Sequence, residues 1–298
     1  MASGFTAAEV GPQHGRRFLI TGANAGLGFE TSKTLAAKGA SVIMACRDED
    51  RAEAAMTNIR KDQPDADLEF LKLDLADLDG VRASAAAVLA RPRIDVLINN
   101  AGVMIPPRML TKQGFELQFG VNHLGTFAFT GLVHGHVDDR IVITASLAHK
   151  GGRIAYNDLA AERSYLRFPR YQWSKLANLM HMYELDRRLR AAGRTTLAVG
   201  CHPGGALTEL SRHLPSPIKL LLPLATPFFN SAAQGAWPTL HAAVGAEVVS
   251  GDYLGPQGLG EIAGRSGQAR ATRLARDPVA AHELWERSID LTGVDPDI

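Results

Sequence analysis

A phenol and an ammonium group lie four residues apart in the stretch YQWSKLANLM, as Tyr171 and Lys175. The residues that follow have the pattern of an amphipathic helix, and positions i and i+4 share one face of a helix. An unperturbed tyrosine has a pKa of about 10, which is too high for a good proton acceptor near neutral pH. An ammonium about 4 Å away would contribute roughly 4 kcal/mol at an effective dielectric near 20, enough to lower that pKa by about two to three units before desolvation opposes it. The pair therefore predicts a group that exchanges a proton near neutrality, although by itself it could be a surface pair.

A glycine-rich turn, TGANAGLG at 21–28, follows the first apolar run of the chain. Gly22, Gly26 and Gly28 would allow positive φ and a close approach of the backbone to a pyrophosphate, which the N-terminus of the following helix would stabilise. The spacing differs from G-x-G-x-x-G, and such a turn alone is weak evidence. Its place between a strand and a helix of a βαβ unit favours dinucleotide binding.

The end of the second apolar run, ACRDED, indicates which dinucleotide fits. An acid there would accept a hydrogen bond from the ribose 2′-hydroxyl of NAD, whereas an arginine would pair with the 2′-phosphate of NADP. Cys46 stands where the acid would usually be, and Arg47 follows it. We therefore expect NADP(H) to be preferred over NAD(H), unless the adjacent Asp48 neutralises Arg47 or Arg47 only caps a strand at the surface.

Strands and helices alternate along the chain with short connections. Strands are predicted at 16–21, 41–46, 68–75, 94–100, 140–146, 195–203 and 251–254, and helices at 26–39, 48–62 and 78–90. This order predicts an α/β fold, a Rossmann-type doubly wound parallel sheet of about seven strands with helices on both faces. We expect a polar N-terminal lead-in over 1–15 and a single domain over 16–298, which includes an apolar, proline-broken segment at about 205–235.

Composition excludes several classes of protein. The 298 residues carry a net charge of +1, so no basic field exists to attract nucleic acid. The most apolar window, 218–229, contains Pro223 and Pro227 and is too short to span a membrane. The two cysteines, Cys46 and Cys201, exclude a disulfide framework, and we expect a cytoplasmic protein. The ten histidines show no metal-ligand spacing, so no metal site is expected.

Seven motifs occur in one order: TGANAGLG, LDL at 73–75, NNAG at 99–102, VNHLG at 121–125, Ser146 after the fifth strand, YQWSK at 171–175 and HPGGALT at 202–208. In this order they resemble the short-chain dehydrogenase/reductase family, from about Arg16 to the end of the chain. MACRDEDRAE, VNHLGTF and YQWSKLAN resemble its retinol dehydrogenase-like and protochlorophyllide reductase-like branch. The long spacing between Ser146 and Tyr171 is typical of the retinol dehydrogenase-like members, whereas TAS stands where they usually have a pair of serines.

The resemblance implies an oxidoreductase that transfers hydride between nicotinamide and an alcohol or carbonyl substrate. Tyr171 would be the acid/base and Ser146 would polarise the substrate oxygen. Lys175 would grip the ribose hydroxyls, and Asn122 would hold a water of a proton relay. The implied cofactor-binding residues are Gly22, Asn24, Ala25, Gly26, Leu27, Gly28, Arg47, Asp74, Leu75, Asn100, Ala101, Gly102, Tyr171, Lys175, Pro203, Gly204 and Thr208, among which Asp74 would bond the adenine edge and Pro203 and Gly204 would border the nicotinamide.

The apolar segment after Pro203 would be the substrate lid of such an enzyme. Its side chains favour a lipophilic, retinoid-, steroid- or long-chain-like substrate, unless they pack on the core or a partner subunit; they are Leu214, Ile218, Leu220, Leu221, Leu222, Phe228 and Phe229. The family also implies a homodimer or homotetramer, and the segment 125–139 is compatible with such a contact.

Two other functions stay open. The first is a non-catalytic NADP(H)-binding redox sensor or regulator on the same fold, although such proteins generally lose the tyrosine or the lysine. The second is epimerisation or dehydration of a sugar nucleotide. The resemblance to enzymes of that kind is weaker, because their glycine spacing is T-G-x-x-G-x-x-G, whereas this chain has T-G-x-x-x-G-x-G.

Overall fold

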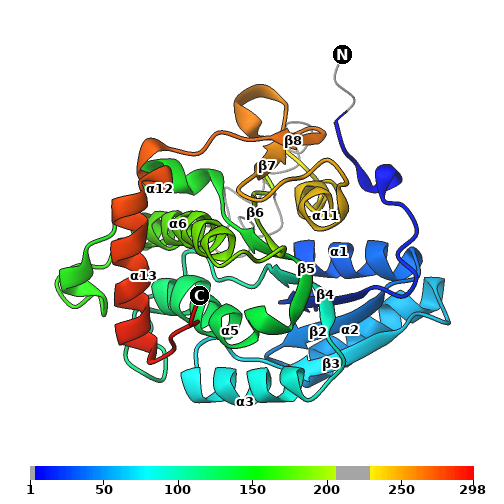
Figure 1. Cartoon of the computed structure of the whole chain (residues 1–298), viewed down its shortest axis with the longest axis horizontal. Coiled ribbons are helices and arrows are strands. Elements are labelled where there is room, and N and C mark those ends of the chain that lie inside the picture. Colours follow the sequence, from blue (N-terminus) through cyan, green and yellow to red (C-terminus); the bar gives the residue numbers. More distant parts are fainter. Residues whose placement is uncertain (1–3, 206–228) are drawn as a thin grey trace, which may run out of the picture.

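The computed structural model describes residues 4–205 and 229–298, in which eight strands form one sheet with the order β3-β2-β1-β4-β5-β6-β7-β8 (Figure 1). The strands are β1 (Arg17–Thr21), β2 (Ser41–Cys46), β3 (Leu68–Lys72), β4 (Ile94–Asn99), β5 (Val137–Thr144), β6 (Leu197–Cys201), β7 (Tyr253–Pro256) and β8 (Ser266–Gln268). Neighbours from β3 to β7 pair in parallel, and β8 pairs antiparallel with β7. The expected doubly wound parallel sheet is confirmed, with β8 added to the seven strands that the sequence indicated.

Helices cover both faces of the sheet. The principal helices are α1 (Gly26–Ala37), α2 (Glu49–Asp62), α3 (Leu78–Leu89), α5 (Thr126–Val133), α6 (Arg167–Ala191), α11 (Trp237–Val244) and α13 (Pro278–Thr292). Buried residues of α1, α2 and α11 share one core with the sheet, and those of α3, α5, α6 and α13 share the other. Within 4–205 and 229–298, none of the helices is long and apolar enough to cross a membrane.

The central strands are apolar along their whole length because both of their faces are covered. In β1, Phe18 and Ile20 enter one core and Leu19, which lies between them, enters the other. This alternation follows from the two-residue period of a strand. It explains why the run RRFLIT shows no alternation of polar and apolar residues.

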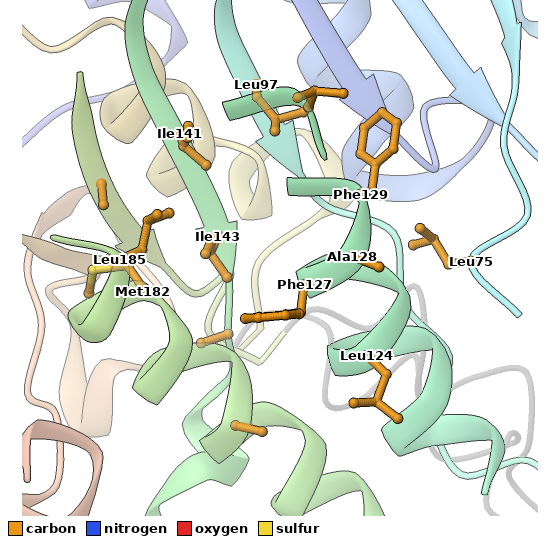
Figure 2. Close-up of a cluster of buried hydrophobic side chains, with 14 of the residues drawn as sticks. Leu75, Leu97, Leu124, Phe127, Ala128, Phe129, Ile141, Ile143, Met182 and Leu185 are labelled. Carbon is orange, nitrogen blue, oxygen red and sulfur yellow. The ribbon is translucent and has the colours of Figure 1, made fainter. Parts of the chain in front are cut away.

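Figure 2 shows the core between the sheet and the helices α5 and α6. Phe127 of α5 is fully buried there, near Ile143 of β5. Its ring lies 5.0 Å from the ring of Trp285 in α13 and 5.2 Å from that of His181 in α6. Phe127 therefore joins three helices to the sheet.

Local signals in the sequence set the helix ends. Asp48 caps α2 by accepting a hydrogen bond from the backbone N–H of Arg51 at 3.1 Å. Gly39 follows α1 at φ +84°, a left-handed conformation that only glycine adopts without strain. Pro278 occupies the first turn of α13 and Gly293 ends that helix at φ +61°.

Helix α13 lies across α6 and the π-helical turn η2 (Gly120–Gly125), at the left of Figure 1. Part of the surface of α6 is therefore covered by the same chain. The expected homodimer or homotetramer stays a prediction.

The N-terminal lead-in is attached to the sheet edge, although its composition is polar. Phe5 and Ser266 of β8 exchange two backbone hydrogen bonds of 2.9 Å, and the ring of Phe5 stacks on His241 at 4.5 Å. A short β-bridge and one aromatic contact therefore hold residues that the sequence presented as a simple lead-in.

Replacing Phe127 with alanine should lower the free energy of unfolding by about 3–5 kcal/mol, because it leaves a cavity where α5, α6 and α13 meet. Urea denaturation followed by circular dichroism would measure it. The matched control is Val279→Ala in α13, whose side chain is 76% exposed and whose loss should change stability by about 0.5 kcal/mol or less. Equal effects of the two substitutions would contradict this account of the core.

Candidate active site

One hollow at the carboxyl ends of the strands collects residues from distant parts of the sequence. Its lining consists of Leu27, Asn100, Gly102, Val103, Thr144, Ala145, Tyr171, Lys175 and Pro203. The segments after β1 and β4 diverge to opposite faces of the sheet, which makes this the place where open α/β sheets bind ligands. Six of the residues implied by the resemblance thus meet in space: Leu27, Asn100, Gly102, Tyr171, Lys175 and Pro203.

The glycine turn packs directly on the segment that follows β4. Gly22 has φ +67°, and a Cβ added to it would lie 2.9 Å from Cα of Ala101. A Cβ on Gly28 would lie 2.4 Å from the carbonyl oxygen of Gly22 and 2.6 Å from Nδ2 of Asn100. Side chains at either position would push the two turns apart, so these glycines are required by close approach of backbone.

Thr21 is a residue for which the sequence suggested no role. Its buried hydroxyl oxygen accepts hydrogen bonds from the backbone N–H of Asn100 at 3.0 Å and of Ala101 at 2.9 Å. The amide of Asn100 in turn donates to the carbonyl of Thr21 at 2.9 Å. These reciprocal bonds fix the turn after β1 to the turn after β4. The only sequence feature that could have indicated this role of Thr21 was its place as a polar residue at the end of an apolar strand.

The N-terminus of α1 has the features of an anion site. Its N-cap, Ala25, is exposed and contributes no side-chain cap, so the first N–H groups of the helix are not satisfied by a capping side chain. Gly26 has φ +54°, and a Cβ there would meet nothing within 4 Å. Open space in front of uncapped N–H groups fits the pyrophosphate of a dinucleotide.

Tyr171 and Lys175 project from the same face of α6, and both are nearly buried, with 6% and 5% of their surfaces exposed. The ammonium nitrogen Nζ of Lys175 lies 5.9 Å from the centroid of the Tyr171 ring. Nζ also donates a hydrogen bond to the carbonyl of Thr144, at the end of β5, at 3.1 Å. The cation is thereby held between the phenol and the end of a strand.

Ser146 lies two residues beyond β5 and begins the 3-10 turn η4 (Leu147–Gly151). Its hydroxyl oxygen accepts a hydrogen bond from the backbone N–H of Ala148 at 3.2 Å. Accepting this bond leaves the hydroxyl proton to donate elsewhere, as polarisation of a substrate oxygen requires. Its neighbour Ala145 lines the hollow, although Ser146 itself does not.

Asn122 is fully buried in the π-helical turn η2. Its amide nitrogen donates to the carbonyl of Val103 and to the hydroxyl of Ser174, both at 2.9 Å, and its amide oxygen accepts from the N–H of Val103 at 2.7 Å. With both amide protons used, a relay water could bind only to the amide oxygen or to the backbone carbonyl. The side chain positions the segment after β4, a function that we did not foresee.

The residues expected to bind the adenosine half follow β2 and β3. Arg47 is exposed, and the ammonium of Lys72 donates to its carbonyl at 2.7 Å. The carboxylate of Asp48, which could have neutralised Arg47, caps the N–H of Arg51 and pairs with the Arg51 guanidinium at 3.3 Å. The backbone of Arg47 therefore lies beside an additional cation, the ammonium of Lys72.

Asp74 and Leu75, which were also expected to bind the adenosine half, differ in the groups that they could present to a cofactor. Asp74 uses Oδ1 to accept from the N–H of Ala76 at 2.9 Å, which fixes its carboxylate in the turn after β3. Leu75 is buried in the core shown in Figure 2. Its side chain cannot face a cofactor while it is packed there, so any contact by Leu75 would be made by its backbone.

The substrate side is only partly described. Gly204 has φ +75°, and the ring of Phe229 packs against Gly205. Thr208 and the side chains expected to line the lid (Leu214, Ile218, Leu220, Leu221, Leu222 and Phe228) lie outside the described residues.

Buried histidines flank the hollow without forming a metal site. His149 is almost wholly inaccessible, and burial lowers its pKa. The same cause lowers the pKa of His202. Across residues 4–205 and 229–298, no group of three or more His, Cys, Asp or Glu side chains is arranged to hold a metal ion.

The sequence matches a known protein family and several known proteins. A sequence profile described as short chain dehydrogenase matches residues 16–218. The chain is 40% identical to human retinol dehydrogenase 12 over 287 residues, which cover 94% of this chain and 87% of that protein. It is also 40% identical to mouse retinol dehydrogenase 14 over 307 residues, covering 96% and 88%.

Solved structures agree with these matches. An uncharacterised protein from Mycobacterium paratuberculosis has a TM-score of 0.85 and 39% identity, covering 99% of this chain and 100% of that one. A protein described as an NAD(P)-dependent gluconate 5-dehydrogenase from Beutenbergia cavernae, which contains bound NADP, has a TM-score of 0.64 and 25% identity, covering 81% and 95%.

Replacing Gly28 with alanine should destabilise the protein by about 1–3 kcal/mol, because the new Cβ would collide with the backbone of Gly22 and with Asn100. Urea denaturation would measure the loss. Gly11→Ala is the control, since a Cβ at Gly11 meets nothing within 4 Å. A Gly28→Ala variant as stable as the control would show that the two turns are not packed as described.

Proposed function

Since the chain belongs to the short-chain dehydrogenase family, in its retinol dehydrogenase-like branch, we propose that it transfers hydride between NADP(H) and a lipophilic alcohol or carbonyl substrate. The observation that carries the proposal is the meeting of Tyr171 and Lys175 with Asn100 and Pro203 around one hollow at the ends of the strands. A phenol, a cation and a strand-end hollow in one place are what proton exchange beside a bound dinucleotide requires.

The site fits a dinucleotide at its pyrophosphate and at its adenosine ribose. The uncapped N-terminus of α1 and the open space before Gly26 suit the pyrophosphate. The exposed Arg47 suits a 2′-phosphate, because Asp48 is engaged by Arg51 and Lys72 adds positive charge nearby. These contacts support a preference for NADP(H) over NAD(H).

The proton chemistry would fall to three side chains. The bound nicotinamide supplies or accepts the hydride. Tyr171 would give its phenolic proton to the substrate oxygen on reduction, or take one from the substrate hydroxyl on oxidation. Lys175, held by the Thr144 carbonyl, would stabilise the phenolate by its charge. Ser146 would donate its hydroxyl proton to the substrate oxygen as negative charge develops there.

The lipophilic substrate is supported by the names of the relatives, several of which are retinol dehydrogenases. The apolar composition of 218–229 is consistent with such a substrate. A cytoplasmic location remains our prediction, which cell fractionation would test.

A non-catalytic redox sensor remains the second candidate. It would use the same dinucleotide site without turnover. The presence of both Tyr171 and Lys175 in the hollow favours the enzyme.

Replacing Arg47 with alanine should weaken NADPH binding by roughly 10- to 100-fold, which corresponds to the loss of about 1.5–3 kcal/mol from a charged hydrogen bond. NADH binding should change by less than about threefold, because NADH lacks the 2′-phosphate. Calorimetric titration with each nucleotide would measure this. Lys61→Ala, which removes an exposed cation near the end of α2, is the control for net charge. Equal binding of NADPH and NADH by the unchanged protein would contradict the NADP preference.

Replacing Tyr171 with phenylalanine should reduce NADPH-dependent turnover of retinal and of long-chain aldehydes by roughly 10²- to 10⁴-fold, since it removes the acid/base. NADPH binding should stay within about threefold. The loss of absorbance at 340 nm would measure turnover, and Tyr156→Phe provides a control hydroxyl outside the hollow. Unchanged turnover would defeat the proposed mechanism, and faster turnover of small polar ketones would defeat the lipophilic substrate.

A further inference from the structure

Glu261 has a backbone conformation that glutamate rarely adopts. It ends the short 3-10 turn η7 (Leu259–Glu261), between β7 and β8, and its φ is +59°. An L-residue in this left-handed region is strained, and such strain persists only where surrounding contacts hold it. The side chain is only 15% exposed, so neighbouring residues cover most of it.

The carboxylate of Glu261 meets three groups from three parts of the chain. Oε2 lies 3.1 Å from the ammonium of Lys150 and 3.5 Å from Nε2 of His202. Oε1 accepts a hydrogen bond from the backbone N–H of Arg270 at 3.0 Å. The contacts with His202 and Lys150 hold the pKa of Glu261 down to about 2, so the group is an anion at any working pH.

His202 connects this anion to the nicotinamide side of the hollow. It is fully buried between β6 and Pro203, and its Nδ1 accepts a hydrogen bond from the N–H of Gly204 at 3.2 Å. In the neutral imidazole, which burial favours, Nε2 then carries the proton. Nε2 lies 3.5 Å from Oε2 of Glu261 and makes no hydrogen bond among the described residues. A Cβ on Gly255 would lie 2.0 Å from Nε2, so the ring is packed tightly against β7.

Ile262, the residue after Glu261, contacts the 203–205 turn through its backbone. The carbonyl of Ile262 accepts a hydrogen bond from the N–H of Gly205 at 2.8 Å. A Cβ on Gly204 would lie 2.2 Å from that carbonyl oxygen, so the two segments fit only because residue 204 is glycine. The turn 203–205 therefore rests on the segment that Glu261 fixes.

Lys150 connects the anion to the loop of Ser146. It lies in η4, which begins directly after Ser146. The adjacent His149 receives a hydrogen bond on Nε2 from the N–H of Thr272 at 3.3 Å, so its Nδ1 donates to the carbonyl of Ser146, 2.7 Å away. Two segments thus hold the serine loop: the one between β7 and β8, through Glu261 and Lys150, and the one after β8, through Thr272 and His149.

We propose that Glu261 is a positioning residue, which sets the nicotinamide half of the cofactor site by holding the 203–205 turn and the Ser146 loop in one arrangement. It would touch neither cofactor nor substrate, and would act through His202 and Lys150. The inference rests on the proposed function, because it assigns Glu261 to one half of the cofactor that the site is proposed to bind.

The test compares two nucleotides that share the adenosine half. NADPH carries a nicotinamide, whereas 2′,5′-ADP ends before it. Calorimetric titrations of the full chain would use the unchanged protein, Glu261→Gln and Glu261→Gly. The glycine variant removes the carboxylate and also relieves the backbone strain, so it should not unfold the protein. Glu247→Gln is the matched control, because Glu247 contacts another buried histidine, His241, at 2.7 Å.

Both Glu261 variants should bind NADPH roughly tenfold more weakly, because the 203–205 turn and the Ser146 loop would no longer be held in one arrangement before binding, and should bind 2′,5′-ADP within about twofold of the unchanged protein. Glu247→Gln should leave both affinities unchanged. Unaltered NADPH binding by the Glu261 variants, or an equal loss for both nucleotides, would overturn the positioning role while leaving the proposed function intact. An unchanged protein that binds neither nucleotide would overturn both.

Discussion

The structure depends on the close approach of two turns at the carboxyl edge of the sheet. The turn after β1 and the turn after β4 are joined through Thr21 and Asn100, and no Cβ fits between them at Gly22 or Gly28. Parallel pairing of β1 with β4 brings these turns side by side, and their divergence to opposite faces opens the hollow. The other residues of the hollow are positioned relative to this junction, because the segments after β1 and β4 supply part of its lining.

A buried cation imposes the second constraint. Lys175 is 5% exposed, and an ammonium so far from water needs compensating oxygen atoms. The Thr144 carbonyl provides one, and Asn178 donates to the same oxygen at 3.1 Å. Helix α6 is thereby fixed to the end of β5, which places Tyr171 over the hollow. The polar network positions the helix as well as serving the chemistry.

The last third of the chain completes a site whose recognisable motifs lie earlier. Helix α13 covers α6 and meets Phe127 through Trp285, so it supports the helix that carries Tyr171. The segment between β7 and β8 reaches back to Lys150 and His202 through Glu261. Contacts between residues more than fifty positions apart therefore support the elements that carry the reactive side chains.

The sequence alone determined the parallel α/β fold and the positions of seven of its strands along the chain, because glycine turns and apolar strand runs are local patterns. Its ordered motifs, through their family resemblance, also indicated six of the residues that line the hollow, but not Val103, Thr144 or Ala145. Only the tertiary structure decided that Asp48 is engaged by Arg51, that Leu75 packs into the core, and that Asn122 holds Val103. It also revealed β8, the attachment of Phe5, and the contacts of Glu261. These features arise from pairings between distant segments, and no local pattern encodes which charged or polar side chain will find which partner once the chain is packed.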